Sequence, residues 1–198
     1  MDQLHPVEVR VLGALLEKDI ATPEYYPLTL NSLQNACNQK SSREPVVSYD
    51  ENTVAQALEL LKNKGLVMRI SGAGHRVEKF AHRLGEKLNL GRRELALLCV
   101  LMLRGPQTVG ELRGRTERMH DFADMEEVER VLESLQAQNL VAPAARGRWV
   151  QLFAGPPGEV AEAEPAVPKS ALEDRVAALE REVEQLKQQF EVFKRQFE

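Results

Sequence analysis

A polar and basic run in the first half of the chain has the residue types that contact nucleic acid. The run consists of Asn38, Gln39, Lys40, Ser41, Ser42 and Arg43. Amide and hydroxyl side chains bond to base edges and phosphates, while lysine and arginine neutralise phosphate charge. Gln56, about one turn into the helix expected after this run, is placed to face a base. These residues predict DNA binding.

The same run also has a purely structural interpretation. Polar side chains in a loop commonly hydrogen-bond to the local backbone, and Asp50 or Asn52 is suited to cap the helix that follows. Both interpretations stay open, although so long a loop inside a compact module is often functional.

The helix that follows the run belongs to a unit that occurs twice. Residues 54–67 reappear as residues 128–141, with matching apolar positions such as Leu58 and Leu132. The helix stop also matches, because Gly65 and Asn139 both accept a left-handed backbone. A repeat that agrees in its core and stop signals predicts a repeated domain.

Each copy predicts three helices followed by a two-stranded hairpin. In the first, helices begin near Pro6, Thr29 and Glu51, and the hairpin covers residues 66–81. In the second, helices cover 92–104, a segment capped by Thr108 and Glu111, and 124–139, before a hairpin over 140–153. This order is typical of a winged helix-turn-helix. We therefore expect a mainly α fold with small β wings, in two tandem winged-helix domains over residues 1–82 and 83–155. The second copy is complete, so we expect it to fold alone.

The hairpins would be the wings, and they add basic residues to the predicted DNA-binding surface. The first carries His75, Arg76 and Lys79, and the second carries Arg146 and Arg148. Arginine suits a narrow minor groove, although a solvated hairpin tip is the alternative for either wing.

The second copy has a poor surface for reading DNA. Its third helix carries Glu126, Glu127, Glu129 and Glu133. Phosphates would repel these side chains, so the first module is expected to make the base contacts. Arg113, Arg115 and Arg118 precede this helix, and we expect them to pair with its glutamates rather than with phosphate.

The last 43 residues predict a linker and a coiled coil. Residues 156–169 are rich in proline, which favours an extended spacer. From residue 170 apolar side chains alternate spacings of four and three, which predicts a coiled-coil helix over 170–198 and a homodimer. The alternative is a helix that folds back onto the modules. The heptad residues are Leu172, Val176, Leu179, Val183, Leu186, Phe190, Phe193 and Phe197.

Composition excludes several function classes. The net charge of −4 resides in the tail, and the two modules are nearly neutral. Cys37 and Cys99 have no metal-ligand spacing, and a single histidine beside Asp121 and Asp124 is a weak metal signal. No catalytic or cofactor-binding motif is present, so we expect neither an enzyme nor a cofactor. Without a signal peptide or a long apolar run, the chain is expected in the cytoplasm and not in a membrane.

Three segments of the chain resemble the YceH-like family, a group of bacterial proteins without an established biochemical role. They are residues 9–18 (VRVLGALLEK), 22–28 (TPEYYPL) and 35–50 (NACNQKSSREPVVSYD). The resemblance covers roughly residues 4–155. It implies tandem winged-helix domains, and it carries over no catalytic or ligand-binding residues.

Two functional hypotheses follow. The first is a DNA-binding protein, with a possible role in transcription regulation, which the basic run at Lys40 to Arg43 favours. The second is a protein–protein adaptor similar in fold to the accessory subunits of bacterial condensins, which the near-neutral modules favour. We prefer DNA binding, because it is the commonest use of this fold.

Overall fold

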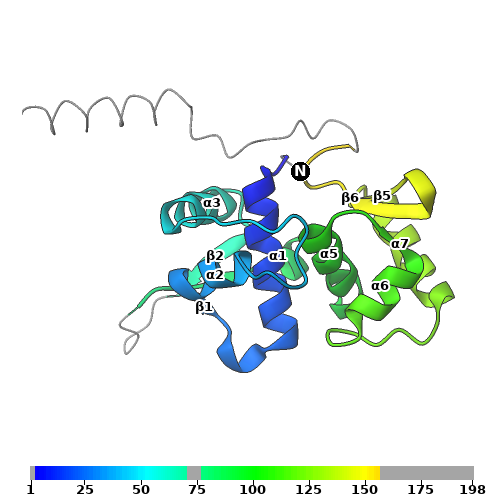
Figure 1. Cartoon of the computed structure of the whole chain (residues 1–198), viewed down its shortest axis with the longest axis horizontal. Coiled ribbons are helices and arrows are strands. Elements are labelled where there is room, and N and C mark those ends of the chain that lie inside the picture. The colour runs from blue at the N-terminus through cyan, green and yellow to red at the C-terminus, as the bar shows by residue number, and fades with distance from the viewer. Residues whose placement is uncertain (1–2, 71–76, 157–198) are drawn as a thin grey trace, which may run out of the picture. The chain divides into compact units, whose positions relative to one another are not determined.

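The computed structural model of the chain describes residues 3–70 and 77–156. This part forms seven α-helices and six short β-strands (Figure 1). The helices are α1 (Pro6–Ala21), α2 (Leu30–Cys37), α3 (Glu51–Asn63), α4 (Leu84–Leu88), α5 (Arg92–Arg104), α6 (Val109–Thr116) and α7 (Met125–Ala137). The strands are β1 (Leu28–Thr29), β2 (Val67–Ile70), β3 (Lys79–His82), β4 (Gln107–Thr108), β5 (Val141–Ala144) and β6 (Arg148–Gln151). The expected class, mainly helical with small antiparallel sheets, is confirmed.

The repeat in the sequence corresponds to a repeat in the structure. Each half has the order helix, strand, helix, helix, strand, strand, and α4 lies between the halves. The strands form two antiparallel sheets with the orders β1-β3-β2 and β4-β6-β5. Thr29 is opposite Lys79 and Thr108 is opposite Arg148, at equivalent positions of the two sheets. We call residues 3–82 the first module and residues 83–156 the second module.

Local signals explain where the helices begin and end. Thr29, Asp50 and Thr108 each accept a hydrogen bond from the backbone in the first turn of their helix, and Thr108 forms a capping box with Glu111. Gly65 and Asn139 follow the matched helices with φ values of 67° and 56°. The predicted left-handed stop is therefore confirmed in both modules.

Three short elements were not predicted. They are β1, β4 and α4, each of two to five residues. Thr29 and Thr108 end their strands and also cap the next helix, so no alternating pattern has room to develop. These two strands add a third member to each predicted hairpin.

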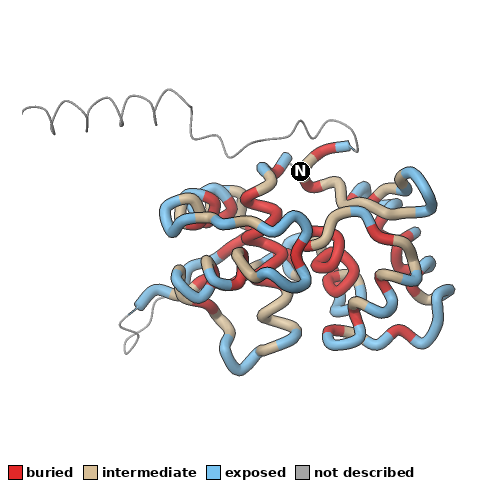
Figure 2. Tube along the Cα trace, viewed as in Figure 1, coloured by how far each residue is buried: buried red, intermediate tan, exposed pale blue. Residues whose placement is uncertain are grey.

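The two modules share one hydrophobic core, which is centred on α1 and α5. These helices pack against each other, and each has a long run of consecutive buried residues, Val7–Leu16 and Leu95–Leu103 (Figure 2). The two helices lie close together at Gly13, because a Cβ there would lie 3.0 Å from Met102 Cβ. A helix that is buried on every side lies between two layers of structure, so each central helix serves both modules.

The shared core bears on the domain prediction. Contacts divide the chain into two compact units, residues 1–161 and 162–198, and both modules lie in the first of these units. The predicted domain boundary after residue 82 therefore falls inside one compact unit, between β3 and α4. Independent folding of the second module stays a prediction, although α5 gains part of its burial from the first module.

Several predictions concern residues outside the described part of the chain. They are the proline-rich linker after Pro156, the coiled coil with its heptad residues Leu172–Phe197, and the wing residues His75 and Arg76. Homodimerisation through residues 170–198 stays a prediction. Among the helices that the structure describes, none is both long and apolar enough to cross a bilayer.

Candidate nucleic-acid interface

A cleft of about 820 Å³ lies between the two modules. The last turns of α1, the loop after α2, the end of α5 and the end of α6 form its walls. Five basic side chains line it against two acidic ones. The basic residues are Lys18, Lys40, Arg104, Arg115 and Arg118, and the acidic residues are Glu17 and Glu117. We call this the cationic cleft.

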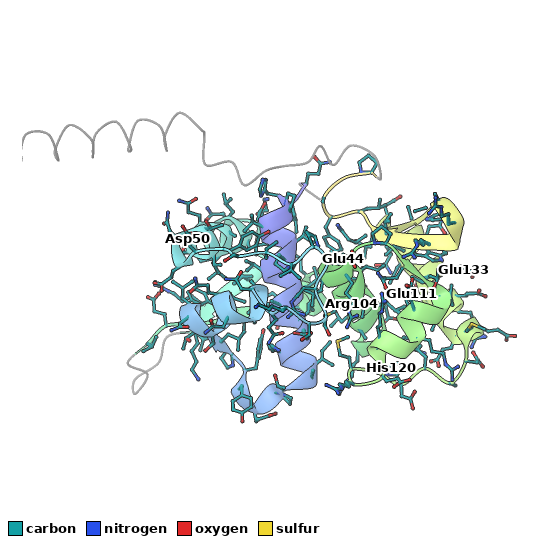
Figure 3. All side chains as sticks on the ribbon, viewed as in Figure 1. Glu44, Asp50, Arg104, Glu111, His120 and Glu133 are labelled. Carbon is teal, nitrogen blue, oxygen red and sulfur yellow. The ribbon has the colours of Figure 1, made fainter. Side chains whose placement is uncertain are left out.

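The positive charge of the cationic cleft is incompletely neutralised. Arg104 lies at the junction of the modules (Figure 3), where its Nη2 donates to Ser42 Oγ at 2.6 Å. Burial lowers the pKa of Arg104, and the like charge of Arg115 lowers it further. Lys40 and Arg118 are exposed and make no ion pair within the described ranges. Lys18 pairs with Glu17 at 3.1 Å, and Arg115 lies 3.5 Å from Glu111. The cations for which the described residues supply no acidic partner are therefore Lys40, Arg104 and Arg118, and this remaining charge favours an anion.

Arg43 does not contribute to this surface, which corrects its predicted role in phosphate binding. Its side chain is fully buried and binds both carboxylate oxygens of Glu17, at 3.0 and 2.6 Å. It also donates to the Ala36 and Ser42 carbonyls and to Gln39 Oε1. Charge-assisted bonds of this kind fix the loop in place, and they leave Arg43 no access to a phosphate.

Of the other residues in the predicted run, one holds the loop in place and four line the cationic cleft. Asn38 braces the loop, because its side chain donates to the Tyr49 carbonyl and accepts from the Tyr49 amide, both at 2.8 Å. The structural interpretation is therefore correct for Asn38 and Arg43. Gln39, Lys40, Ser41 and Ser42 line the cationic cleft. They remain candidate contacts to an anion.

The other predicted contacts that fall within the described residues do not line the cleft. Gln56 is exposed on α3, and Lys79 is half-buried on β3. Neither residue lines the cationic cleft. In the second hairpin Arg146 is exposed, while Arg148 donates to the Pro106 carbonyl and pairs with Glu111. Arg148 is thus already occupied within its own module.

The expectation that three arginines pair with the glutamates of α7 is wrong. Arg115 lies 3.5 Å from Glu111 on its own helix, and Arg113 donates to the carbonyls of Phe122 and Ala123. The arginine that lies near an α7 carboxylate is instead Arg93, whose Nη1 is 3.5 Å from Glu127, and His120 Nε2 is 4.0 Å from the same side chain. Arg115 and Arg118 face the cationic cleft, where the sequence did not place them.

Sequence reasoning also missed Lys18 and Arg104 as site residues. Each lies in the last turn of its helix, where a basic residue is expected simply to balance the helix dipole. Arg104 reaches the loop because α5 packs against α1, and no local sequence pattern indicates that packing. One sequence signal could have identified these site residues: α1, α5 and α6 each carry a basic residue in their last turn.

The two cysteines contribute no charge to the cationic cleft. Cys37 and Cys99 are buried free thiols, as the sequence predicted for Cys99. Burial raises the pKa of Cys37 to about 12 and also raises that of Cys99. Among the described residues, no group of three histidine, cysteine or acidic side chains is placed to hold a metal.

Comparison with known proteins gives a consistent family assignment. A family described as "Protein of unknown function, DUF480" matches residues 4–147. A UPF0502 protein of Solibacter usitatus is 55% identical over 179 residues, which cover 87% of this chain and 86% of the relative. Another, of Geotalea daltonii, is 54% identical and covers 88% of this chain and 83% of the relative. The resemblance noted in the sequence is confirmed: the chain belongs to the DUF480 or UPF0502 family of uncharacterised bacterial proteins.

Proposed function

We propose that this chain is a cytoplasmic, non-catalytic DNA-binding protein with two winged-helix modules, whose cationic cleft contacts the phosphate backbone. The order of helices and strands in each module supports the winged-helix assignment. The observation that carries the proposal is the gathering of five basic side chains from both modules around one cleft. Affinity from such contacts depends on charge and not on base sequence.

The charge on the helices argues for backbone contacts over base readout. The exposed side of α3 carries Glu51 and Glu59, and Lys62 is engaged by Glu59. On α7, Glu126, Glu129 and Glu133 are all exposed. A third helix with this charge gains little from entering a major groove, so binding is expected to be weakly dependent on sequence.

Duplex binding with a steep salt dependence is the expected result for the full chain. Replacing both Lys40 and Arg118 with alanine should weaken binding to every sequence and lower the slope of log K against log salt by about two units. Fluorescence anisotropy on random-sequence duplexes, from low to moderate salt, measures both quantities.

The matched control replaces two basic residues that lie outside the cleft. Lys62 and Arg69 are each engaged by an acid, Glu59 and Glu78, and do not line the cleft. Alanine at both positions should leave the salt slope nearly unchanged. Equal effects of the two double variants would show that the cleft is not the binding surface, and absence of duplex binding at low salt would end the DNA proposal.

A second candidate is the protein–protein adaptor. It is favoured by the acidic exposed face of α7 and by three exposed apolar side chains near one sheet, Leu60 on α3, Met68 on β2 and Val77 before β3. Charge reversal at Glu129 and Glu133 would weaken an adaptor that holds a basic partner segment. The same change should slightly strengthen DNA binding, so the two candidates respond in opposite directions.

A further inference from the structure

A second cavity, separate from the cationic cleft, lies on the other side of the loop after α2. Its volume is about 380 Å³, within the range of small-molecule sites. Val9, Leu101, Met102 and Val150 supply apolar walls from α1, α5 and β6. The polar side chains that line the cavity are those of Arg10, Glu44, Tyr49 and Gln151. An apolar cavity with a few polar groups, built between two modules, has the composition of a ligand site.

Arg10 is the unusual member of this cavity. It is 4% exposed, yet it forms no ion pair within the part of the chain that the structure describes. Its Nη1 donates to the Cys37 carbonyl at 3.2 Å, and its Nη2 donates to the Pro45 carbonyl at 2.6 Å. A guanidinium has five N–H groups, so these bonds leave further donors for an acceptor in the cavity. Burying a charge without an opposite charge is costly.

The electrostatic surroundings of Arg10 favour an anion. Burial lowers its pKa, and the nearby positive charge of Arg43 opposes its own. Glu17, the acid close to Arg43, is already bound to that residue. The Tyr49 hydroxyl is protonated at neutral pH and can donate a hydrogen bond, and burial raises its pKa further. Glu44 at the cavity wall is exposed and makes no described bond to Arg10, and its charge disfavours a ligand with two negative charges.

We propose that this cavity binds a small monocarboxylate with an apolar body, and that Arg10 receives the carboxylate. The planar guanidinium matches a carboxylate in shape and supplies the missing opposite charge. The apolar walls take the rest of the molecule. The site is distinct from the cationic cleft, so the proposal holds whether or not the protein binds DNA.

Phenylacetate and its uncharged analogue phenylacetamide are the probes for this site. With full-length protein labelled at methionine methyl groups, phenylacetate should shift the Met102 signal, since Met102 lines the cavity. The exposed Met125 on α7 serves as the internal control. Phenylacetate should bind at least about tenfold more tightly than phenylacetamide, because a hydrogen bond to a charged group is the stronger one. Equal affinities, or no saturable shift at Met102, would refute the proposal.

Two variants test the role of the cavity itself. Arg10→Met should remove the preference for phenylacetate over phenylacetamide. Because it also removes two bonds to backbone carbonyls, this variant is at risk of misfolding. Val150→Phe, which fills the cavity from half-buried β6, should abolish binding of both probes while the protein stays folded. Retained binding in folded Val150→Phe would show that the probes bind elsewhere.

Discussion

Replacing Glu17 with glutamine is expected to destabilise the protein by about 3 to 5 kcal/mol, because the fully buried Arg43 then has no opposite charge. In the native protein both carboxylate oxygens of Glu17 accept from Arg43. A glutamine can accept at one position only and brings no charge. Urea denaturation followed by circular dichroism gives the difference in free energy of unfolding.

Two further variants serve as controls for Glu17→Gln. Glu24→Gln changes an exposed carboxylate for which the structure records no ion pair among its described residues, and it should have almost no effect. The double variant Glu17→Gln with Arg43→Met should be more stable than Glu17→Gln alone, since it removes the stranded charge. If Glu17→Gln were as stable as the native protein, the Glu17–Arg43 ion pair would not make the expected contribution to stability.

The same pair makes stability depend on pH in a defined direction. The pKa of Glu17 lies below its ordinary value of 4.5, because the bonds and charge of Arg43 outweigh the effect of burial. A depressed folded-state pKa contributes stability above the unfolded value, and that contribution is lost as pH falls through the folded value. The gap in stability between native protein and Glu17→Gln should therefore be full at neutral pH and shrink below about pH 4.5.

Placing valine at Gly13 is expected to destabilise the protein by about 2 to 3 kcal/mol through overpacking. A Cβ at this position would lie 3.0 Å from Leu103 Cδ2 and 3.0 Å from Met102 Cβ, and valine adds two further methyl groups. Because α1 and α5 are both buried there, neither helix can move aside without disturbing its own module. Thermal and urea denaturation measure the loss.

Gly114 provides the matched control for this prediction. It also lies inside a helix, α6, but a Cβ there would meet nothing within 4 Å. Gly114→Val should change stability by no more than about 0.5 kcal/mol, since only helix propensity changes. Similar losses at Gly13 and Gly114 would mean that the contact between α1 and α5 is not what makes the first glycine necessary.

Local sequence signals were sufficient for most helices and for the repeat. Asp50 and the Thr108–Glu111 pair fix helix starts through hydrogen bonds within one turn, and Pro6 favours a helix start through its restricted φ. Gly65 and Asn139 fix two helix ends through their own backbone preference. Such signals need no knowledge of tertiary contacts. The two-residue strands β1 and β4 depend on pairing with β3 and β6, so no local pattern marks them.

The candidate site was predicted less well, for a physical reason. The sequence singles out the run at residues 38–43 as a candidate site, but it does not say which of these side chains turn inward. Arg43 turns toward Glu17, 26 positions away, while Lys40 stays exposed. Likewise Arg104 meets Ser42 across 62 positions. Such contacts depend on tertiary packing, of the loop against α1 for Arg43 and of α5 against α1 for Arg104. Apolar periodicity predicts that these helices are buried, but it does not say which helices pack together.

The shared core also couples the two copies of the repeated unit. Their first helices pack against each other instead of each completing a separate core. At Gly13 the two copies approach so closely that a larger side chain in one has to be accommodated by Met102 and Leu103 in the other. Surface charge carries no such constraint, and the exposed glutamates of α7 differ freely from the residues of α3. Natural variants should therefore carry paired changes across this contact, and a relative with one copy alone should have a polar face where α5 is apolar.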